Sequence, residues 1–536
     1  MKLIFISGGV ISGIGKGISA ASIGLLLKKH SINVSFLKCD PYINVDAGTM
    51  NPIEHGEVFV LDDGYEIDMD GGHYERFTDI SLSKYNSITT GQIYSQVIKN
   101  ERNLKYDGAC VEVIPHIREE IITRIKESYD SHDVLIIEIG GTVGEYQNDI
   151  YYEAERYLKQ KLGADLLHIH IGYLPVPNSI GEMKTKPTQQ SVILLNQRGI
   201  FPDIIIGRSE KTIDSIRKKK ISIATNVGEE NIFSNIDVNS IYKVPKLFYS
   251  QKLDLRIIEL LNLKSQKIDF SDWDNLIKKI DNTPKQSINI GIIAKYHTSG
   301  KFSLEDSYVS VIEAIKSACW ELNIAFKLKW IDAENFSEKD ISSCDGFIVP
   351  GGFGKRGIDG KIKAIKYARE NNKPYLGLCL GMQLAAIEFA KNVCSIKDAN
   401  SEEVDEFAKN KIIHIMPEQE KKLLDKNYGG SMRLGAWKCV LEKNTLAYKS
   451  YNKSQISERH RHRYEFNNSY EEIFEKNGMI FSGKSIDGNL VEIMELKEHP
   501  FFVGVQFHPE LKSRPLSPHP LFSKFISVII EQNGTI

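Results

Sequence analysis

Short apolar runs alternate with helical segments along the first half of the chain. Runs of four to six residues that are mainly apolar and lack polar alternation predict strands buried on both faces of a parallel sheet; they lie at residues 3–6, 34–38, 134–138, 166–171 and 204–207. Segments between them, such as 19–29 and 153–161, predict helices. This alternation predicts repeated strand–helix–strand units.

A second series of the same kind follows a break in the pattern. Residues 264–287 are polar, carry the single Trp273 and end in Asn282-Thr283-Pro284, which predicts a linker with one short helix. Further strands are predicted at 288–294, 326–331, 346–349, 375–378, 412–415 and 503–507. We therefore expect an α/β protein with two doubly wound, mostly parallel-sheet domains, at 1–265 and 287–536, joined by a linker at 266–286.

Composition narrows the functional classes. Of 536 residues, 41% are hydrophobic and 26% charged, which excludes disordered and fibrous proteins. The 68 basic and 70 acidic side chains argue against bulk binding of nucleic acid or an anionic membrane. No apolar stretch reaches the roughly 20 residues of a membrane helix, and the first strand is too short for a signal-peptide core. Seven irregularly spaced cysteines do not predict disulfides, so we expect a reducing, cytoplasmic compartment.

A glycine-rich loop follows the first predicted strand. Its sequence is Ser7-Gly8-Gly9-Val10-Ile11-Ser12-Gly13-Ile14-Gly15-Lys16-Gly17. Backbone N–H groups at glycines, the helix N-terminus and the Lys16 ammonium can together hold phosphate. The spacing is one residue longer than in a standard P-loop, and Gly17 replaces the hydroxyl residue that holds magnesium there. A glycine-rich turn without a ligand is the alternative, but the strand–loop–helix context favours a phosphate site.

Two carboxylates could replace the missing hydroxyl. Asp70 lies in Asp68-Met69-Asp70-Gly71-Gly72-His73, and Glu138 ends a predicted strand. Carboxyl ends of parallel strands face the ligand crevice, and Mg²⁺ prefers oxygen ligands. Either acid alone could cap a turn, but beside the Lys16 loop they predict a magnesium site. The polar string Lys184-Thr185-Lys186-Pro187-Thr188-Gln189 is a candidate triphosphate loop.

The second half contains a candidate nucleophile. Gly377 and Gly381 flank Cys379 as glycines flank the serine of a nucleophile elbow, and a helix N-terminus there favours the thiolate. The turn Pro350-Gly351-Gly352-Phe353-Gly354 can supply an oxyanion hole with the N–H of Leu380. In Phe507-His508-Pro509-Glu510, His508 could act as base and Glu510 could orient its ring. A buried structural cysteine and a structural histidine are the alternatives.

Several motifs in both halves of the chain resemble those of known families. The second domain resembles the class I glutamine amidotransferases in Pro-Gly-Gly-Phe-Gly, Gly-Leu-Cys-Leu-Gly-Met-Gln and Phe-His-Pro-Glu. The first, with a P-loop-like amidoligase fold, resembles the CTP synthase family in the Lys16 loop, Lys-Cys-Asp-Pro-Tyr-Ile-Asn-Val-Asp, Glu-Ile-Gly-Gly-Thr-Val-Gly and Lys-Thr-Lys-Pro-Thr-Gln. The match runs from about residue 2 to about residue 525.

This resemblance implies a reaction. ATP phosphorylates O4 of UTP, glutamine is hydrolysed at Cys379, and the ammonia travels through an internal tunnel to C4, giving CTP. It also implies Mg²⁺, activation by GTP, inhibition by CTP, and a homotetramer able to form filaments, with no nucleic-acid or membrane partner.

The resemblance also assigns residues, all of which stand in this sequence. Catalytic roles fall to Lys16, Lys38, Cys379, His508 and Glu510, and metal binding to Asp70 and Glu138. Asp40 is placed near the transferred phosphoryl group. ATP would be held by Gly13, Ile14, Gly15, Lys16, Gly17, Ile18, Asp70, Asp237 and Val238. UTP or CTP would be held by Ser12, Glu145, Gln147, Lys184, Thr185, Lys186, Pro187, Thr188, Gln189 and Lys220. Glutamine would be held by Gly352, Leu380, Gly381, Met382, Gln383, Glu403 and Arg463, under a lid of Phe353, Arg356 and residues 429–435.

The sequence departs from the family pattern in one region. The family usually has Gln at Glu112, Thr at Arg118, a different string at 144–148, and small residues at 175–180. These positions belong to the expected pyrimidine-nucleotide site. Lineage drift is one explanation; another pyrimidine-like substrate, or altered CTP feedback, is the other. An idle assembly protein is a third hypothesis, against which the intact catalytic residues argue.

Overall fold

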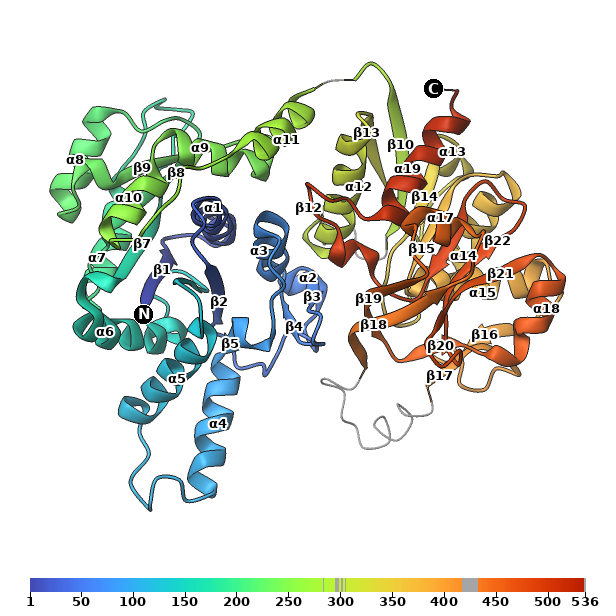
Figure 1. Ribbon diagram of the computed structural model, residues 1–536, viewed down its shortest axis with the longest axis horizontal. Coiled ribbons are helices and arrows are strands. Elements are labelled where there is room, and N and C mark those ends of the chain that lie inside the picture. Colours follow the sequence, from blue (N-terminus) through green and yellow to red (C-terminus); the bar gives the residue numbers. More distant parts are fainter. Residues whose placement is uncertain (283, 295–297, 300–301, 304, 417–431, 535–536) are drawn as a thin grey trace. The chain divides into compact units, whose positions relative to one another are not determined.

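The computed structural model describes residues 1–536 except 283, 295–297, 300–301, 304, 417–431 and 535–536. The chain forms two compact units (Figure 1). The first comprises Met1–Ala47 and Asp70–Ile277, and the second Gly48–Met69 and Lys278–Ile536. The sequence did not anticipate that residues 48–69 pack with the second half of the chain.

The first unit is built on a seven-stranded sheet, parallel throughout, in the order β5-β2-β6-β1-β7-β8-β9. Its strands are β1 (Lys2–Gly8), β2 (Val34–Asp40), β5 (Ser87–Thr89), β6 (Val134–Ile139), β7 (Leu166–Tyr173), β8 (Ile204–Ser209) and β9 (Ile232–Ile236). The five predicted strands are β1, β2, β6, β7 and β8. The other two, β5 and β9, were not predicted, because β5 has three residues and β9 carries polar Ser234 and Asn235.

Helices cover both faces of this sheet, as the two-sided burial of its strands requires. On one face Phe36 of β2 stacks on Tyr74 and lies against Gly24 of α1. On the other face Leu37, its neighbour in sequence, joins a core cluster with α4, α5 and α6. The helices are α1 (Lys16–Lys29), α3 (Asp70–Thr78), α4 (Thr90–Arg102), α5 (Arg118–Tyr129), α6 (Asp149–Leu162), α7 (Lys186–Asn196), α8 (Ser215–Thr225), α9 (Val244–Ser250), α10 (Leu253–Leu260) and α11 (Ser271–Asp281).

Helix α11 is the short helix expected in the linker. Its Trp273 is fully buried, packs beside Phe77 and Tyr242, and donates from Nε1 to the Tyr242 carbonyl at 2.8 Å. The start of the helix therefore belongs to the core of the first unit.

The described part of the second unit contains a nine-stranded sheet in the order β13-β10-β14-β15-β23-β22-β21-β18-β19. The first five are parallel and the last four are added antiparallel. The strands are β10 (Ser287–Ala294), β13 (Ala325–Asp332), β14 (Gly346–Val349), β15 (Tyr375–Leu378), β18 (Arg433–Leu441), β19 (Gln455–His462), β21 (Met479–Ser485), β22 (Val491–Leu496) and β23 (Phe502–Val505). This confirms the expected class of two doubly wound α/β domains.

The predicted strand at 412–415 forms, but outside the main sheet. It is β17 (Asn410–Ile415), which pairs with β16 (Ala399–Ser401) and β20 (Tyr464–Phe466) in a three-stranded sheet. A smaller ribbon pairs β11 (Thr298–Ser299) with β12 (Phe302–Ser303).

Helices also cover both faces of the second sheet. Ile348 of β14 packs into the cluster with α12 and α19, whereas its neighbours Phe347 and Val349 pack into the cluster with α14 and α15. The helices are α12 (Val309–Glu321), α13 (Glu338–Ser342), α14 (Ile358–Glu370), α15 (Leu380–Asn392), α17 (Leu446–Tyr451), α18 (Glu471–Lys476) and α19 (Pro520–Gln532). Among the described residues, none of the helices in either unit is long and apolar enough to span a membrane.

Residues 48–69, which we call the inserted segment, form three short elements within the second unit. These are α2 (Pro52–His55), β3 (Val58–Val60) and β4 (Glu66–Asp68), with β3 and β4 paired antiparallel. Gly64 lies against Leu434, and the Ala436 N–H donates to the Asp62 carbonyl at 2.9 Å. The segment is thus held along the start of β18.

Candidate active sites

The glycine-rich loop connects β1 to α1. Gly13 and Gly15 have φ of 70° and 96°, a region that side chains disfavour, and nothing crowds their Cα positions. Helix α1 begins at Lys16, whose buried ammonium donates to the Gly141 carbonyl at 2.8 Å. The loop therefore presents free backbone and a lysine at a helix N-terminus, as phosphate binding requires.

The place of Gly17 explains why no hydroxyl residue stands there. A Cβ at Gly17 would overlap the carboxylate of Asp70. Asp70 begins α3, so the carboxylate is brought to the start of α1 by a separate helix. The carboxylate thus occupies the space where a P-loop has its hydroxyl.

Lys38, from β2, lies between the two predicted metal ligands. Its ammonium forms a close ion pair with Asp70 and lies 3.5 Å from Glu138 and 3.7 Å from Asp40. The Tyr74 hydroxyl donates to the other oxygen of Glu138. The carboxylates therefore converge on one cation position at the carboxyl ends of β2 and β6.

Burial and mutual charge set the ionisation of this cluster. Burial alone would raise the pKa of Asp70, but the charges of Lys38, His73 and Lys16 outweigh it and lower that pKa. Burial and the charge of Asp70 raise the pKa of Glu138. Burial lowers the pKa of Lys16. A divalent cation at Asp70 and Glu138 would offset the repulsion between their carboxylates.

These two carboxylates fit Mg²⁺ in donor chemistry. Among the described residues no group of three or more His, Cys, Asp or Glu side chains is arranged to hold a metal. Mg²⁺ does not need one, because it keeps several waters and commonly binds through one or two carboxylates plus substrate phosphates.

The predicted pyrimidine-nucleotide residues occupy neighbouring strand ends. Thr185 directly precedes α7, without a side-chain capping bond, and Pro187 stands in the first turn of that helix. The Thr188 hydroxyl donates to the Tyr173 carbonyl at 2.8 Å. The Gln189 amide donates to the Thr185 hydroxyl at 3.0 Å and to the Lys220 carbonyl at 3.5 Å. The remaining lysines are partly or fully exposed: Lys184, which pairs with Glu182 at 2.8 Å, Lys186 and Lys220.

The turn after β6 brings the next two predicted residues together. Glu145 accepts from the Thr142 N–H at 2.9 Å and hydroxyl at 2.7 Å, and from the Gln147 amide at 3.0 Å. Burial would raise the pKa of Glu145, but the Thr142 hydrogen bonds outweigh it and lower that pKa. The departures Glu112 and Gln147 are both exposed, as is Ser12 in the glycine loop.

The proposed adenine residues follow β9. Asp237 donates its N–H to the Ser209 carbonyl at 3.0 Å and pairs with Arg208 at 2.8 Å, and Val238 is half-buried beside it. They lie at the same edge of the sheet as the phosphate loop, but after β9, the last strand of that sheet.

Cys379 occupies a strained turn between β15 and α15. Its φ of 50° and ψ of −102° are unfavourable for a residue with a Cβ. A side chain at Gly381 would overlap the Val349 carbonyl, and one at Gly377 would lie 2.6 Å from the Tyr375 hydroxyl oxygen. Both glycines are therefore needed for the elbow, and the buried cysteine is held at the N-terminus of α15.

His508 and Glu510 follow β23, the parallel neighbour of β15, so they lie at the same edge of the sheet as Cys379. His508 Nδ1 lies 2.7 Å from Glu510 Oε1. Burial alone would lower the pKa of His508, but Glu510 and Cys379 outweigh it and raise the pKa to about 10. At neutral pH the imidazole is therefore protonated.

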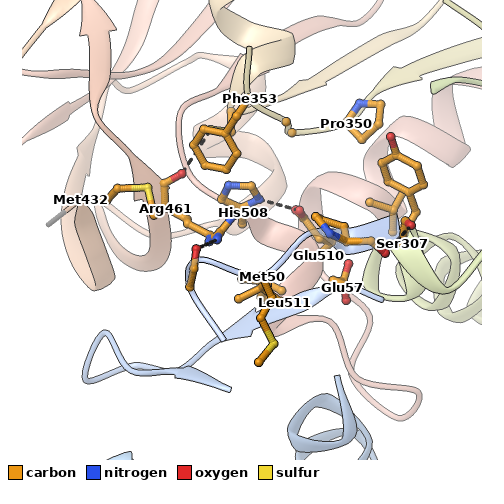
Figure 2. A pocket seen from close by; sticks show the side chains of 18 of the residues that line it. Met50, Glu57, Ser307, Pro350, Phe353, Met432, Arg461, His508, Glu510 and Leu511 are labelled. Atoms are coloured by element: carbon orange, nitrogen blue, oxygen red, sulfur yellow. Dashed lines mark hydrogen bonds and ion pairs between the residues drawn. The ribbon is translucent and has the colours of Figure 1, made fainter. Parts of the chain in front are cut away.

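The glycine turn 350–354 lies next to His508 and Leu380. A Cβ at Gly351 would meet the His508 ring at 2.7 Å, and one at Gly352 would lie 3.6 Å from Leu380. The Gly354 N–H donates to Glu403 at 2.7 Å. A cavity of about 260 Å³ is lined by Gly352, Cys379, Arg463, His508 and Glu510, together with residues of the inserted segment (Figure 2).

Four other predicted glutamine residues directly follow Cys379 in the chain. Leu380, Gly381, Met382 and Gln383 form the first turn of α15, and the Gln383 amide donates to the Tyr464 carbonyl at 3.0 Å. Of the predicted lid, residues 429–431 lie outside the described residues, and Arg356 pairs with Glu334 at 2.8 Å.

Two residues around Cys379 were not predicted. The side chain of Gln506 is buried. Its amide nitrogen donates to Cys379 Sγ at 3.7 Å, and its amide oxygen accepts from the Gln383 amide at 3.3 Å. The Arg461 carbonyl accepts from the thiol at 3.8 Å. Gln506 could have been found, since it precedes His508 by two residues and such spacing places side chains on one side of an extended chain. Arg461 gave no local signal.

For the glutamine hydrolysis that the resemblance implies, replacing Glu510 with Gln should move the alkaline limb of the pH profile toward neutral pH. Without the carboxylate, His508 loses its proton at lower pH, so we expect a shift of more than about one pH unit. The measurement is kcat/KM for glutamine from about pH 6 to about pH 10.5. Glu498→Gln, an exposed site, is the control. An unmoved limb in Glu510→Gln would mean that Glu510 does not set the ionisation of His508.

Comparisons with known proteins identify the family of the chain. Residues 2–263 match the family model described as CTP synthase N-terminus, and residues 303–528 match glutamine amidotransferase class-I. A CTP synthase of Hydrogenobaculum sp. is 48% identical over 98% of this chain and 97% of its own, and one of Bacillus subtilis is 47% identical over 99% of each. The glutaminase domain of Trypanosoma brucei CTPS with bound acivicin is 35% identical, covers 46% of this chain and 94% of that one, and has a TM-score of 0.42. With relatives this similar along almost its whole length, the chain belongs to the CTP synthase family, as a glutamine-hydrolysing enzyme that forms CTP from UTP.

Proposed function

We propose that the enzyme activates UTP by phosphorylating O4 with ATP, and then aminates C4 with ammonia released at Cys379. The observation that carries the proposal is that one chain holds two complete sets of groups. A lysine, glycine-loop and carboxylate cluster suits phosphoryl transfer, and a cysteine–histidine–glutamate set suits amide hydrolysis.

In the first unit the residues position and neutralise phosphate. The glycine loop and Lys16 hold the ATP phosphates, and Lys38 offers its ammonium to the phosphoryl group in transit between ATP and O4 of UTP. Asp70 and Glu138 would hold Mg²⁺, which when bound supplies positive charge to the phosphates. The product O4-phosphate is a better leaving group than oxide, so ammonia can displace phosphate at C4.

In the second unit the residues suit a thioester route. The Cys379 sulfur attacks the side-chain amide carbon of glutamine, with the developing oxyanion facing the N–H groups of the 350–354 turn and Leu380. His508, protonated at neutral pH, gives its proton to the departing ammonia. Water then cleaves the thioester and releases glutamate, with His508 taking a proton from that water.

The cavity at Cys379 supports a protected exit for ammonia. Besides Cys379, its lining includes Met50 and Glu57 of the inserted segment and Ser307; Figure 2 labels these last three. Ammonia in bulk water at neutral pH would be mostly protonated, as a lysine amine is, and would not attack C4. We propose that the route begins in this cavity.

Further proposals rest on the family resemblance. We propose domains at 1–265 and 287–536 with a linker at 266–286, activation by GTP, feedback by CTP, and a homotetramer able to form filaments. Exposed apolar side chains in the first unit support an interface between copies; Tyr146 is 94% exposed and Ile43 is 79% exposed.

An assay of pyrimidine nucleotides tests the substrate. Purified enzyme is incubated with ATP, Mg²⁺, glutamine and, in turn, UTP, dUTP or 5-substituted UTP, and amination is followed by the absorbance change from uracil to cytosine. We expect UTP to have the highest kcat/KM and added CTP to inhibit. Turnover confined to another nucleotide, or no inhibition by CTP, would favour the altered-site alternative that Glu112 and Gln147 suggest; no glutamine hydrolysis at all would favour the idle assembly protein.

A further inference from the structure

Three carboxylates of the inserted segment bind it to the rest of the second unit. Glu57 accepts from the Ser310 N–H at 3.0 Å, so it caps the N-terminus of α12, where a negative charge is favourable. Asp62 pairs with Arg459 at 2.6 Å, and Glu66 pairs with Arg461 at 2.7 Å. Both arginines project from β19, two residues apart and therefore on one face of the strand.

Of the two arginine–carboxylate ion pairs, the Arg461–Glu66 pair has the more buried carboxylate. The Glu66 side chain is 2% exposed, whereas that of Asp62 is 37% exposed. The Arg461 guanidinium also donates to the Gly48 carbonyl at 3.0 Å. Arg461 therefore binds the inserted segment at two places, at its first residue, Gly48, and near its end, in β4.

Arg461 also contacts the glutaminase site itself. Its guanidinium lies 5.0 Å from the ring centre of Phe353, within cation–π distance. Its carbonyl accepts from the Cys379 thiol. Figure 2 shows Arg461, Phe353 and His508 around the same cavity, with the inserted segment beside them.

Phe353 lies in the oxyanion turn, where Glu403 also holds the Gly354 N–H at 2.7 Å. It stands between Gly352 and Gly354 in a stretch without helix or strand, where glycines leave the backbone freely adjustable. The N–H groups of this turn must face the oxyanion closely to stabilise it. A side chain fixed elsewhere and touching Phe353 restricts the turn.

Arg459 provides the internal comparison. Its guanidinium contacts Asp62 and lies 5.3 Å from the Phe59 ring centre, and both residues belong to the inserted segment. Arg459 and Arg461 therefore anchor the same segment, and Arg461 in addition contacts Phe353 of the oxyanion turn.

We propose that Arg461 is a positioning residue for glutamine hydrolysis: held by Glu66 and Gly48, it fixes Phe353 and with it the oxyanion turn. This inference rests on the proposed role of Cys379. It makes the inserted segment, which leads directly into the metal-site residue Asp70, a structural part of the glutaminase site.

The test compares Arg461→Met with Arg459→Met in the full-length enzyme. Steady-state glutamine hydrolysis gives kcat and KM. The circular dichroism spectrum and the thermal unfolding transition of each variant show that it is folded. For Arg461→Met we expect kcat to fall about tenfold, the size of a small misplacement of catalytic groups, with KM for glutamine changed less than about twofold. Arg459→Met should keep kcat within about twofold.

Conservative variants strengthen the test. Arg461→Lys keeps a cation beside Phe353 and should recover part of the lost kcat, and Glu66→Gln should lose part of it. If Arg461→Met does not fold, Glu66→Gln carries the comparison, against Asp62→Asn. Equal losses in the Arg461 and Arg459 variants, or unchanged kcat in Arg461→Met and Glu66→Gln, would overturn the proposal. Glutamine hydrolysis surviving in Cys379→Ala would instead overturn the proposed function.

Discussion

Cys379→Ala should abolish CTP formation from glutamine and leave CTP formation from added ammonia intact. Without the sulfur no thioester forms, and the rest of the elbow cannot replace it, so we expect glutamine-dependent synthesis to fall at least about a thousandfold. The ammonia-dependent rate should stay within about twofold, because Cys379 belongs to the second unit and the phosphate cluster to the first. Both rates are read from the same absorbance assay.

The control for this variant is Cys394→Ala. Cys394 lies just beyond α15 in the same unit, and burial raises its pKa to about 11, so it is a poor nucleophile at neutral pH. It should keep both rates. Loss of the ammonia-dependent rate in Cys379→Ala would show that the division of labour between the two halves is wrong.

Lys16→Ala should remove both routes to CTP. The buried Lys16 ammonium lies at the N-terminus of α1, beside the Gly141 carbonyl and the Asp70 and Glu138 charges, so its loss removes phosphate binding and charge stabilisation together. We expect both rates to fall at least about a hundredfold, as when one strong electrostatic group is removed from an active site. Rates with glutamine and with ammonia are measured at saturating UTP.

Lys29→Ala is the matched control, a lysine at the exposed end of the same helix that pairs with Asp272 at 2.6 Å. It should behave as wild type. Alkylation of Cys379 by iodoacetamide should be unchanged in Lys16→Ala, which shows that the second unit is intact. A variant that keeps the ammonia-dependent rate would contradict the role of Lys16.

Most of the parallel strands could be predicted, because two-sided burial leaves a run of apolar residues; β5 and β9 were the exceptions in the first sheet. Residues 134–138 are an example of such a run, and they lie in β6. The antiparallel strands β18, β19, β21 and β22 could not, because polar residues interrupt their apolar runs even where they are buried. Strand β19 reads Gln-Ile-Ser-Glu-Arg-His-Arg-His, and its Glu458, Arg459 and His460 are buried.

The candidate sites show the same limit. Local motifs predicted Cys379 and His508, since glycines beside a nucleophile and a strand end carry their own signal. The approach of Asp70 to Gly17 depends on two helices far apart in sequence. The packing of residues 48–69 with β18 and β19 depends on long-range ion pairs, such as Glu66 with Arg461, that no spacing along the chain reveals.

The origin of the CTP nitrogen tests the whole account most directly. Enzyme, UTP, ATP and Mg²⁺ are supplied with glutamine labelled with ¹⁵N in its side-chain amide, in the presence of unlabelled ammonium at neutral pH, and the CTP is analysed by mass spectrometry. We predict CTP that carries one ¹⁵N atom. No CTP, or CTP that carries only unlabelled nitrogen, would contradict the account.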